Sequence, residues 1–317
     1  MAIQPTDSIP SINTVKAGKL IVPTSDCFGI LNTLMKSLVG LLGYPLGHSI
    51  SPAFQQAAFD FYCLNTIYEA WPTPPDLLQS KVASLRNPEY LGANITVPHK
   101  ERIQDMVDIM DPEAEKIGAV NTIVNNRGSL EGHNTDSQGF MIPLKKLAGF
   151  DIVGKRILLV GAGGAARAAV FALSCEPIQS LTISNRTQVK AKNLAATVRD
   201  LVPEISYTGL ESPEFTKAVS QADIIVNSTS IGMSGTDDPR LSPIPTSWIS
   251  PNSLVYDMVY NPPITPLLSE ALRAGASVLG GLPMLVQQGA LAFEKWTQLD
   301  APIDLMSKAA AEALSKT

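Results

Sequence analysis

The sequence contains few of the residues from which disulfide frameworks and metal sites are built. Its 317 residues include only three cysteines, Cys27, Cys63 and Cys175, an odd number at wide spacing. This pattern is typical of reduced thiols in a cytoplasmic protein and not of a disulfide-linked secreted domain. There are also only three histidines, His48, His99 and His133. They have no metal-ligand spacing with one another or with cysteine, so we expect no metal centre.

Positive charge and long apolar runs are also scarce. Charged residues make up 17% of the chain and the net charge is −5, which argues against nucleic-acid binding through a basic surface. No apolar window reaches the roughly 18 residues that a membrane-spanning helix needs. The N-terminus lacks the basic start, apolar core and small-residue cleavage site of a signal peptide. We therefore expect a globular, cytoplasmic protein that acts on a small molecule, with no nucleic-acid or membrane partner.

The middle of the chain carries the strongest motif, KRILLVGAGGAARA, at positions 155–168. The apolar run 156–160 predicts a buried strand, and Gly161, Gly163 and Ala166 follow it in the pattern G-x-G-x-x-A. An alanine-rich, helix-forming stretch comes next, so the free N–H groups of a helix N-terminus would face an anion. This predicts a dinucleotide-binding loop; the alternative is a glycine-rich turn in an ordinary βαβ unit. The expected cofactor contacts in it are Gly161, Gly163, Gly164 and Ala165.

The next predicted strand, 180–184, indicates which dinucleotide binds. An NAD site usually places a carboxylate at the end of this strand, about 20 residues beyond the glycines. Between the glycines and the strand end the only carboxylate is Glu176, which precedes the strand. At the end of this strand stand Asn185, Arg186, Thr187 and Lys190 instead. The positive charges of Arg186 and Lys190 suit a 2′-phosphate, which favours NADP; the alternative is that they are solvated surface charges.

The rest of the chain divides around this motif. Residues 1–34 mix proline, serine and threonine with short apolar runs, and we expect a poorly ordered extension there. Strand candidates follow at 37–42, 66–70 and 91–97. From about Ser137 onwards, short apolar runs alternate with helix-forming stretches in the rhythm of an open parallel sheet. These runs lie at 156–160, 181–184, 224–227 and 254–258.

A loop rich in turn-forming residues, GYPLGHSISP, follows the first strand candidate. Its two glycines and two prolines give it a fixed shape, from which Ser49 and Ser51 can offer two hydroxyl groups. Ser51 could instead cap a helix that begins near Pro52, and residue types alone do not decide between these roles.

Three further polar residues stand in short motifs beside strand or turn segments. Lys100 ends NITVPHK and, taken alone, would be an ordinary surface charge. Asn121 in GAVNT and Asp136 in GHNTD change that estimate, because binding residues tend to be presented on such loops.

In this order, the motifs resemble those of the shikimate dehydrogenase family. The resemblance runs from about residue 37 to the C-terminus through GYPLGHSISP, NITVPHK, GAVNT, GHNTD, GAGGAARA, SNRT, NSTSIGM, DMVYNPPITPLL and MLVQQ. It implies the reversible, NADPH-dependent reduction of 3-dehydroshikimate to shikimate, a step towards the aromatic amino acids.

The resemblance also implies an α/β fold with an N-terminal mixed α/β substrate domain and a Rossmann-type, doubly wound NADP-binding domain. The substrate-binding domain would span 35–137, with the C-terminal helices 286–317 returning to it, and the Rossmann domain would span 138–285. The extension at 1–34 is outside the family pattern.

Roles carry over by resemblance, position by position. Lys100 and Asp136 match the catalytic pair, and Ser49 and Ser51 match the serines that hold the substrate carboxylate. Other substrate positions are matched by Asn94, Thr96, Asn121, Tyr260 and Gln288. Besides the glycine loop, cofactor positions are matched by Asn185, Arg186, Thr187, Lys190, Thr229, Ser230, Met258 and Gly281. Lys190 stands where many relatives have arginine, so it would grip a phosphate with less defined geometry.

Two other functions remain open at this point. A quinate or broad quinate/shikimate dehydrogenase would need room near Ser49 for an extra hydroxyl group, and the missing carboxylate after the second Rossmann strand disfavours NAD-dependent versions. A non-catalytic sensor of shikimate-like ligands is a different class of protein, and the presence of both Lys100 and Asp136 argues against it. The sequence is compatible with a monomer or a homodimer.

Overall fold

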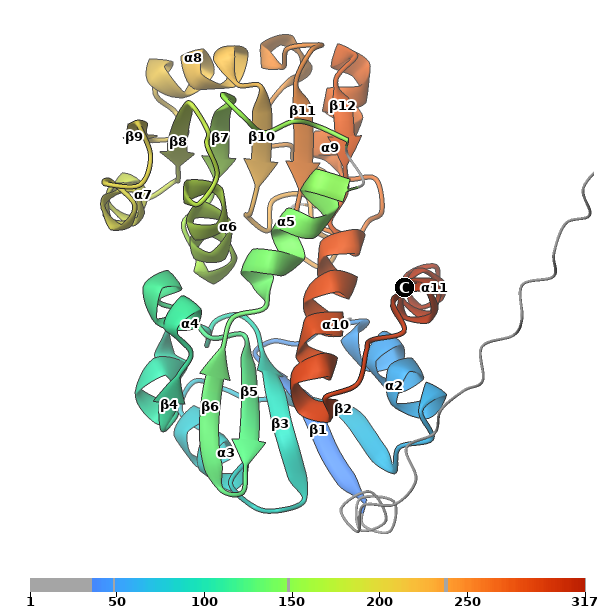
Figure 1. The fold of residues 1–317 in the computed structure, drawn as a ribbon. Helices are drawn as coiled ribbons and strands as arrows, with labels where there is room; N and C mark the ends of the chain where they lie inside the picture. The colour runs from blue at the N-terminus through green and yellow to red at the C-terminus, as the bar shows by residue number, and fades with distance from the viewer. Residues whose placement is uncertain (1–35, 48, 147–148, 237–238, 317) are drawn as a thin grey trace, which may run out of the picture.

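The structure, a computed structural model, describes residues 36–316 except positions 48, 147–148 and 237–238. The predicted extension at 1–34, with Cys27, and the position of His48 lie outside the described residues. The described chain forms two lobes, each built on a six-stranded sheet (Figure 1). The predicted α/β class is confirmed.

The N-terminal lobe carries a mixed sheet in the order β2-β1-β3-β5-β6-β4. Its strands are β1 (Ser37–Gly43), β2 (Thr66–Pro72), β3 (Tyr90–Ile95), β4 (Ile109–Met110), β5 (Thr122–Asn126) and β6 (Ser129–His133). Its helices are α2 (Ser51–Phe61), α3 (Leu78–Ser84), the 3₁₀ helix η1 (Arg102–Met106) and α4 (Pro112–Ile117). Strands β1, β2 and β3 run parallel, whereas β5 runs antiparallel to β3 and β6. The three strands predicted for this lobe are present, with small shifts at their ends.

The second lobe carries a parallel sheet in the order β12-β11-β10-β7-β8-β9. Its strands are β7 (Arg156–Val160), β8 (Ser180–Ser184), β9 (Glu204–Thr208), β10 (Ile224–Asn227), β11 (Leu254–Asp257) and β12 (Ser277–Leu279). Its helices are α6 (Gly164–Ser174), α7 (Gln188–Thr197), α8 (Pro213–Gln221), the 3₁₀ helix η2 (Thr246–Trp248) and α9 (Pro266–Ala274). The four strands predicted from apolar runs are all present.

Strand β7 shows why apolar runs in the sequence predicted the inner strands of the parallel sheet. Ile157 and Leu159 point into a core shared with α6 and α7, while Leu158 and Val160 point into a second core shared with α8 and α9. Helices therefore cover both faces, which makes the strand a continuous apolar run. The doubly wound, Rossmann-type architecture predicted for this lobe is confirmed.

Helices α5 (Asp136–Lys146) and α10 (Leu282–Thr297) run side by side between the lobes (Figure 1). They approach closely at Gly139, where an added Cβ would lie 2.7 Å from the Cβ of Gln288. Helices α10 and α11 (Ile303–Leu314) pack on the N-terminal lobe, where Phe293 and Met306 share a core with Phe54 of α2. The first turn of α5 and the middle of α10 thus meet where the lobes join.

Candidate active site

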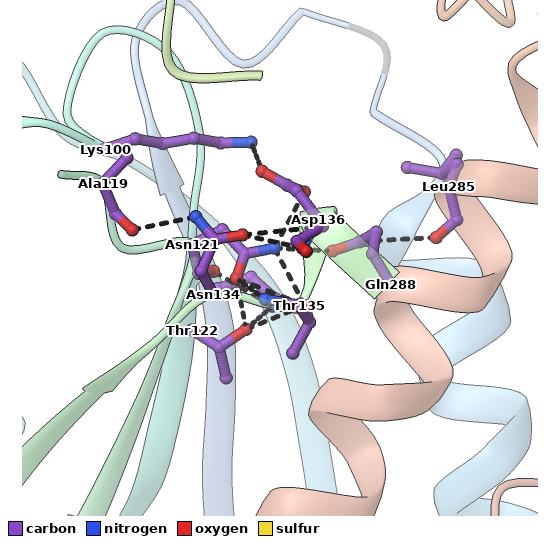
Figure 2. Close-up of polar contacts among 11 residues, drawn as sticks. Lys100, Ala119, Asn121, Thr122, Asn134, Thr135, Asp136, Leu285 and Gln288 are labelled. Atoms are coloured by element: carbon purple, nitrogen blue, oxygen red, sulfur yellow. Dashed lines mark hydrogen bonds and ion pairs between the residues drawn. The ribbon is translucent and has the colours of Figure 1, made fainter. Parts of the chain in front are cut away.

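Lys100 and Asp136 meet at the junction of the two lobes although 36 residues separate them. Lys100 Nζ lies 2.5 Å from Asp136 Oδ2, and the two side chains are 14% and 5% exposed (Figure 2). Thr96 directly follows β3 and leads into the turn to Lys100, while Asp136 is the first residue of α5. The alternative of a solvated surface charge at Lys100 is wrong, because the lysine is largely buried against a carboxylate.

Asn134 fixes the turn that presents Asp136. Its Oδ1 accepts hydrogen bonds from the backbone N–H groups of Asp136 and Ser137, at 3.0 and 3.3 Å. Its Nδ2 donates to the carbonyl of Ala119 at 2.8 Å. A side-chain acceptor at a helix start satisfies N–H groups that the helix itself cannot. The same amide therefore starts α5 and ties it to the GAVNT segment.

Asn121 is the centre of the polar network in Figure 2. Its Nδ2 lies within 2.8 Å of both Asp136 Oδ1 and Thr135 Oγ1, and 3.3 Å from Gln288 Oε1. Its Oδ1 accepts from the Thr135 N–H at 2.7 Å. One carboxylate oxygen of Asp136 thus faces the amide and the other faces Lys100, which sets the orientation of the carboxylate.

Asn94 joins this network from β3 and brings in residues that the sequence analysis missed. Its Nδ2 donates to Thr122 Oγ1 at 3.2 Å and to the Asn121 carbonyl at 3.3 Å, and its Oδ1 accepts from Tyr68 Oη at 2.8 Å. Thr122 and Thr135 belong to motifs already singled out, so they could have been found. Tyr68, whose pKa burial raises, lies in β2 without any local signal.

Ser49, Ser51 and Tyr260 form a second hydrogen-bonded group. The Ser51 N–H donates to Ser49 Oγ at 3.3 Å, and the Ser49 side chain hydrogen-bonds Tyr260, which follows β11. Burial raises the pKa of Tyr260, and the hydrogen bond to Ser49 opposes that rise. Helix α2 has Ile50 at its N-cap and no side-chain cap hydrogen bond, so the alternative capping role of Ser51 is wrong.

The glycine loop fits a bound phosphate group and also touches the lysine. Gly161 has φ +120°, and an added Cβ would lie 2.3 Å from Ser228 Oγ, so only glycine fits. Gly163 caps α6 and is followed by Gly164 and Ala165 in its first turn. A Cβ on Gly164 would lie 3.0 Å from the Cβ of Lys100. The residues present therefore fit a dinucleotide pyrophosphate, at a helix N-terminus beside the Lys100 stem.

The cationic segment follows β8 at the same edge of the sheet. Thr187 is the N-cap residue of α7, and its carbonyl accepts from Asn185 Nδ2 at 3.0 Å. Arg186 and Lys190 are both exposed there. Both cations are therefore accessible at the edge of the sheet where β8 ends.

The remaining predicted cofactor positions lie beyond β10 and β11. Thr229 donates through its N–H and its hydroxyl to Asn227 Oδ1, and Ser230 is exposed next to it. Gly281 caps α10, and an added Cβ would lie 2.2 Å from the carbonyl oxygen of Met258. The glycine allows α10 to begin directly against the end of β11.

The described part of the chain holds no group of three His, Cys, Asp or Glu side chains placed for a metal ion. No helix within it is long and apolar enough to cross a membrane. Cys63 and Cys175 are free and exposed.

Comparisons with protein-family models match most of the chain in three segments. A model of the shikimate dehydrogenase substrate binding domain matches residues 41–123. A shikimate / quinate 5-dehydrogenase model matches residues 144–234, and a shikimate 5′-dehydrogenase C-terminal domain model matches residues 281–311.

Individual relatives give the same picture. The chain is 44% identical over 280 residues to a shikimate dehydrogenase (NADP(+)) of Moorella thermoacetica, covering 87% of this chain and 93% of that one. The crystal structure of shikimate 5-dehydrogenase from Thermus thermophilus, in complex with NADP(H) and shikimate, has a TM-score of 0.78 and 37% identity, covering 87% and 99%. A quinate dehydrogenase from Corynebacterium glutamicum in complex with NAD also has a TM-score of 0.78, with 26% identity and coverage of 87% and 99%.

Proposed function

The chain belongs to the shikimate dehydrogenase family, and from this premise we propose that it reduces 3-dehydroshikimate to shikimate, reversibly and with NADPH. It is an NADP-dependent oxidoreductase, and the reaction is a step of aromatic amino-acid biosynthesis. The observation that carries the proposal is the buried Lys100–Asp136 pair, which lies against a dinucleotide-type glycine loop. Hydride transfer and proton transfer can then occur side by side.

Lys100 moves the proton in the proposed reaction. NADPH supplies the hydride when it is bound. As the substrate carbonyl is reduced, its oxygen needs a proton, which the Lys100 ammonium donates; in the reverse direction the neutral amine accepts the hydroxyl proton. Asp136 stabilises and orients the ammonium, while burial opposes the charge. Asn121 holds one oxygen of Asp136 and leaves the other to the lysine.

Substrate binding is assigned to the polar groups around this pair. Ser49 and Ser51 would hold the carboxylate from their fixed loop. Asn94, Thr96, Asn121 and Gln288 would hydrogen-bond the substrate, with Tyr260 near it. Two hydrogen-bonded groups support this assignment: Asn94 donates to the Asn121 carbonyl and Asn121 donates to Gln288, while Tyr260 hydrogen-bonds Ser49.

Cofactor binding is assigned to the edge of the second sheet. The pyrophosphate would lie on Gly161, Gly163, Gly164 and Ala165, where the positive-φ glycine turn and the free helix N–H groups support it. Asn185, Arg186, Thr187 and Lys190 would bind the adenosine 2′-phosphate. Thr229, Ser230, Met258 and Gly281 would line the other half.

The proposal assigns the substrate and the cofactor to different domains of the chain. Residues 35–137 would be the substrate-binding domain, joined by helices 286–317, and residues 138–285 would be the NADP-binding domain. We place the enzyme in the cytoplasm, in keeping with its scattered, odd-numbered cysteines.

Replacing Ser49 or Ser51 with alanine is expected to raise the KM for shikimate on the order of 10-fold, because the hydrogen bond from the serine hydroxyl to the substrate carboxylate is lost. The KM for NADP should stay within about twofold of wild type. Ser80→Ala, which removes an exposed hydroxyl from α3, is the matched control. An unchanged KM for shikimate in both variants would reassign the two serines to a structural role.

The proposed function is tested with purified wild-type protein by steady-state rates on shikimate and on quinate, each with NADP and with NAD. We expect shikimate with NADP to give the highest kcat/KM. Comparable rates on quinate would identify the broader dehydrogenase. Quinate is included because the chain is also similar to a quinate dehydrogenase. Ligand binding without turnover would identify the sensor.

A further inference from the structure

Asp257 is a buried carboxylate that neither the proposed catalysis nor the proposed binding uses. It ends β11, is 0% exposed and accepts three hydrogen bonds. Asn227 Nδ2 and the Val259 N–H reach its Oδ1 at 2.9 and 3.0 Å, and Thr265 Oγ1 reaches its Oδ2 at 2.6 Å. Burial raises the pKa of Asp257 to about 6 although all three hydrogen bonds lower it. At neutral pH the ionised carboxylate is thus held at an electrostatic cost.

Each of the three donors controls a different segment at the same edge of the sheet. Asn227 ends β10, and its Oδ1 receives both the N–H and the hydroxyl of Thr229. Val259 follows Met258, and its carbonyl accepts from the Gly281 N–H at 3.3 Å. Thr265 caps α9 through the Leu268 N–H. The carboxylate therefore binds together a loop, the end of a strand and the start of a helix.

The sheet order indicates which half of a dinucleotide these segments would face. A dinucleotide lies across the crevice where the strand order reverses, with its pyrophosphate at the first helix N-terminus. Here that point is β7 and α6, with β8 and the cationic segment on one side and β10 and β11 on the other. With the adenosine phosphate at β8, the nicotinamide half lies over β10 and β11.

We propose that Asp257 is a positioning residue for the nicotinamide half of NADP. It acts through the three segments that its hydrogen-bond donors hold: the loop after β10, the loop after β11 and the start of α9. The proposal rests on NADP as the cofactor, as assigned above. It makes Asp257 a determinant of how the nicotinamide faces the substrate, without contact to either molecule.

The test compares binding of whole NADP with binding of adenosine 2′,5′-bisphosphate, which carries only the adenosine half. Asp257→Ala leaves three donors without their acceptor and is expected to raise the Kd for NADP roughly 5–30-fold, and to lower kcat. Asp257→Asn retains one acceptor oxygen and should have an intermediate effect. In both variants the Kd for adenosine 2′,5′-bisphosphate and the KM for shikimate should stay within about twofold of wild type.

Asp223→Ala is the matched control, because Asp223 stands at the opposite end of β10, where it pairs with Arg156. It should leave both dissociation constants unchanged. Should Asp257→Ala be recovered unfolded, Asp257→Asn and Thr265→Val, which removes one of the three donors, carry the same comparison. Equal weakening of NADP and adenosine 2′,5′-bisphosphate would overturn the proposal, as would no weakening of either. Wild-type protein that does not bind NADP would instead refute the cofactor assignment of the proposed function.

Discussion

Replacing Lys100 with alanine is expected to lower kcat by roughly 10²–10⁴-fold while changing the KM for shikimate far less. The reason is that a positioned acid and base acts mainly in the transition state, so its loss appears in kcat. Lys100 is suited to that role because its Nζ is held 2.5 Å from Asp136 in a largely buried site. The measurement is steady-state kinetics in both directions, with NADP in excess for shikimate oxidation and NADPH in excess for 3-dehydroshikimate reduction.

Lys116→Ala provides the control, since it removes an exposed ammonium group from α4 in the same lobe and should leave kcat within about twofold. A Lys100→Ala variant with a raised KM and an unaltered kcat would make Lys100 a binding residue. The proton would then be handled by Asp136 or by water, which the pH dependence of kcat in that variant would distinguish.

Asp136 is part of the same expectation because its role is defined through Lys100. Asp136→Asn keeps the size of the side chain and the contact with Asn121 but removes the charge that holds the ammonium. It should also lower kcat, and the Lys100→Ala, Asp136→Asn double variant should lose less than the product of the two separate losses. Residues that work as one unit are not additive.

The four inner strands of the parallel sheet could be predicted from sequence because they are buried on both faces, as β7 shows, whereas the edge strands β9 and β12 are more exposed and were not predicted. The β5–β6 hairpin could not, since Thr122–Asn126 and Ser129–His133 are short and only partly apolar. Its two-residue turn has φ +54° at Arg127 and +93° at Gly128. Both values are positive, as a type I′ hairpin turn requires, but arginine in place of the usual asparagine or aspartate concealed the signal.

The candidate site was visible in the sequence only as separate motifs. Nothing local in NITVPHK or GHNTD says that Lys100 and Asp136 touch; the family resemblance indicated the pair, and the fold brings the two side chains together. Tyr68 and Asp257 stayed hidden for a different reason. The role of each depends on a hydrogen-bond partner far along the chain: Asn94 lies 26 residues from Tyr68, and Asn227 lies 30 residues from Asp257. The local sequence does not indicate these partners.

Arg186→Ala is expected to raise the KM for NADP by about 10–150-fold and the KM for NAD little, since a charge-assisted hydrogen bond to the 2′-phosphate contributes roughly 1.5–3 kcal/mol. Arg186 is exposed just after β8, so its truncation should not disturb packing, and the loss would report on the cofactor alone. Lys192→Ala, which removes an exposed cation further along α7, should leave both constants within about twofold. No effect of Arg186→Ala on either constant would mean that the cations at this edge are solvated charges. Equal losses on NADP and NAD would mean that Arg186 binds a part that the two cofactors share, and either result would contradict the prediction.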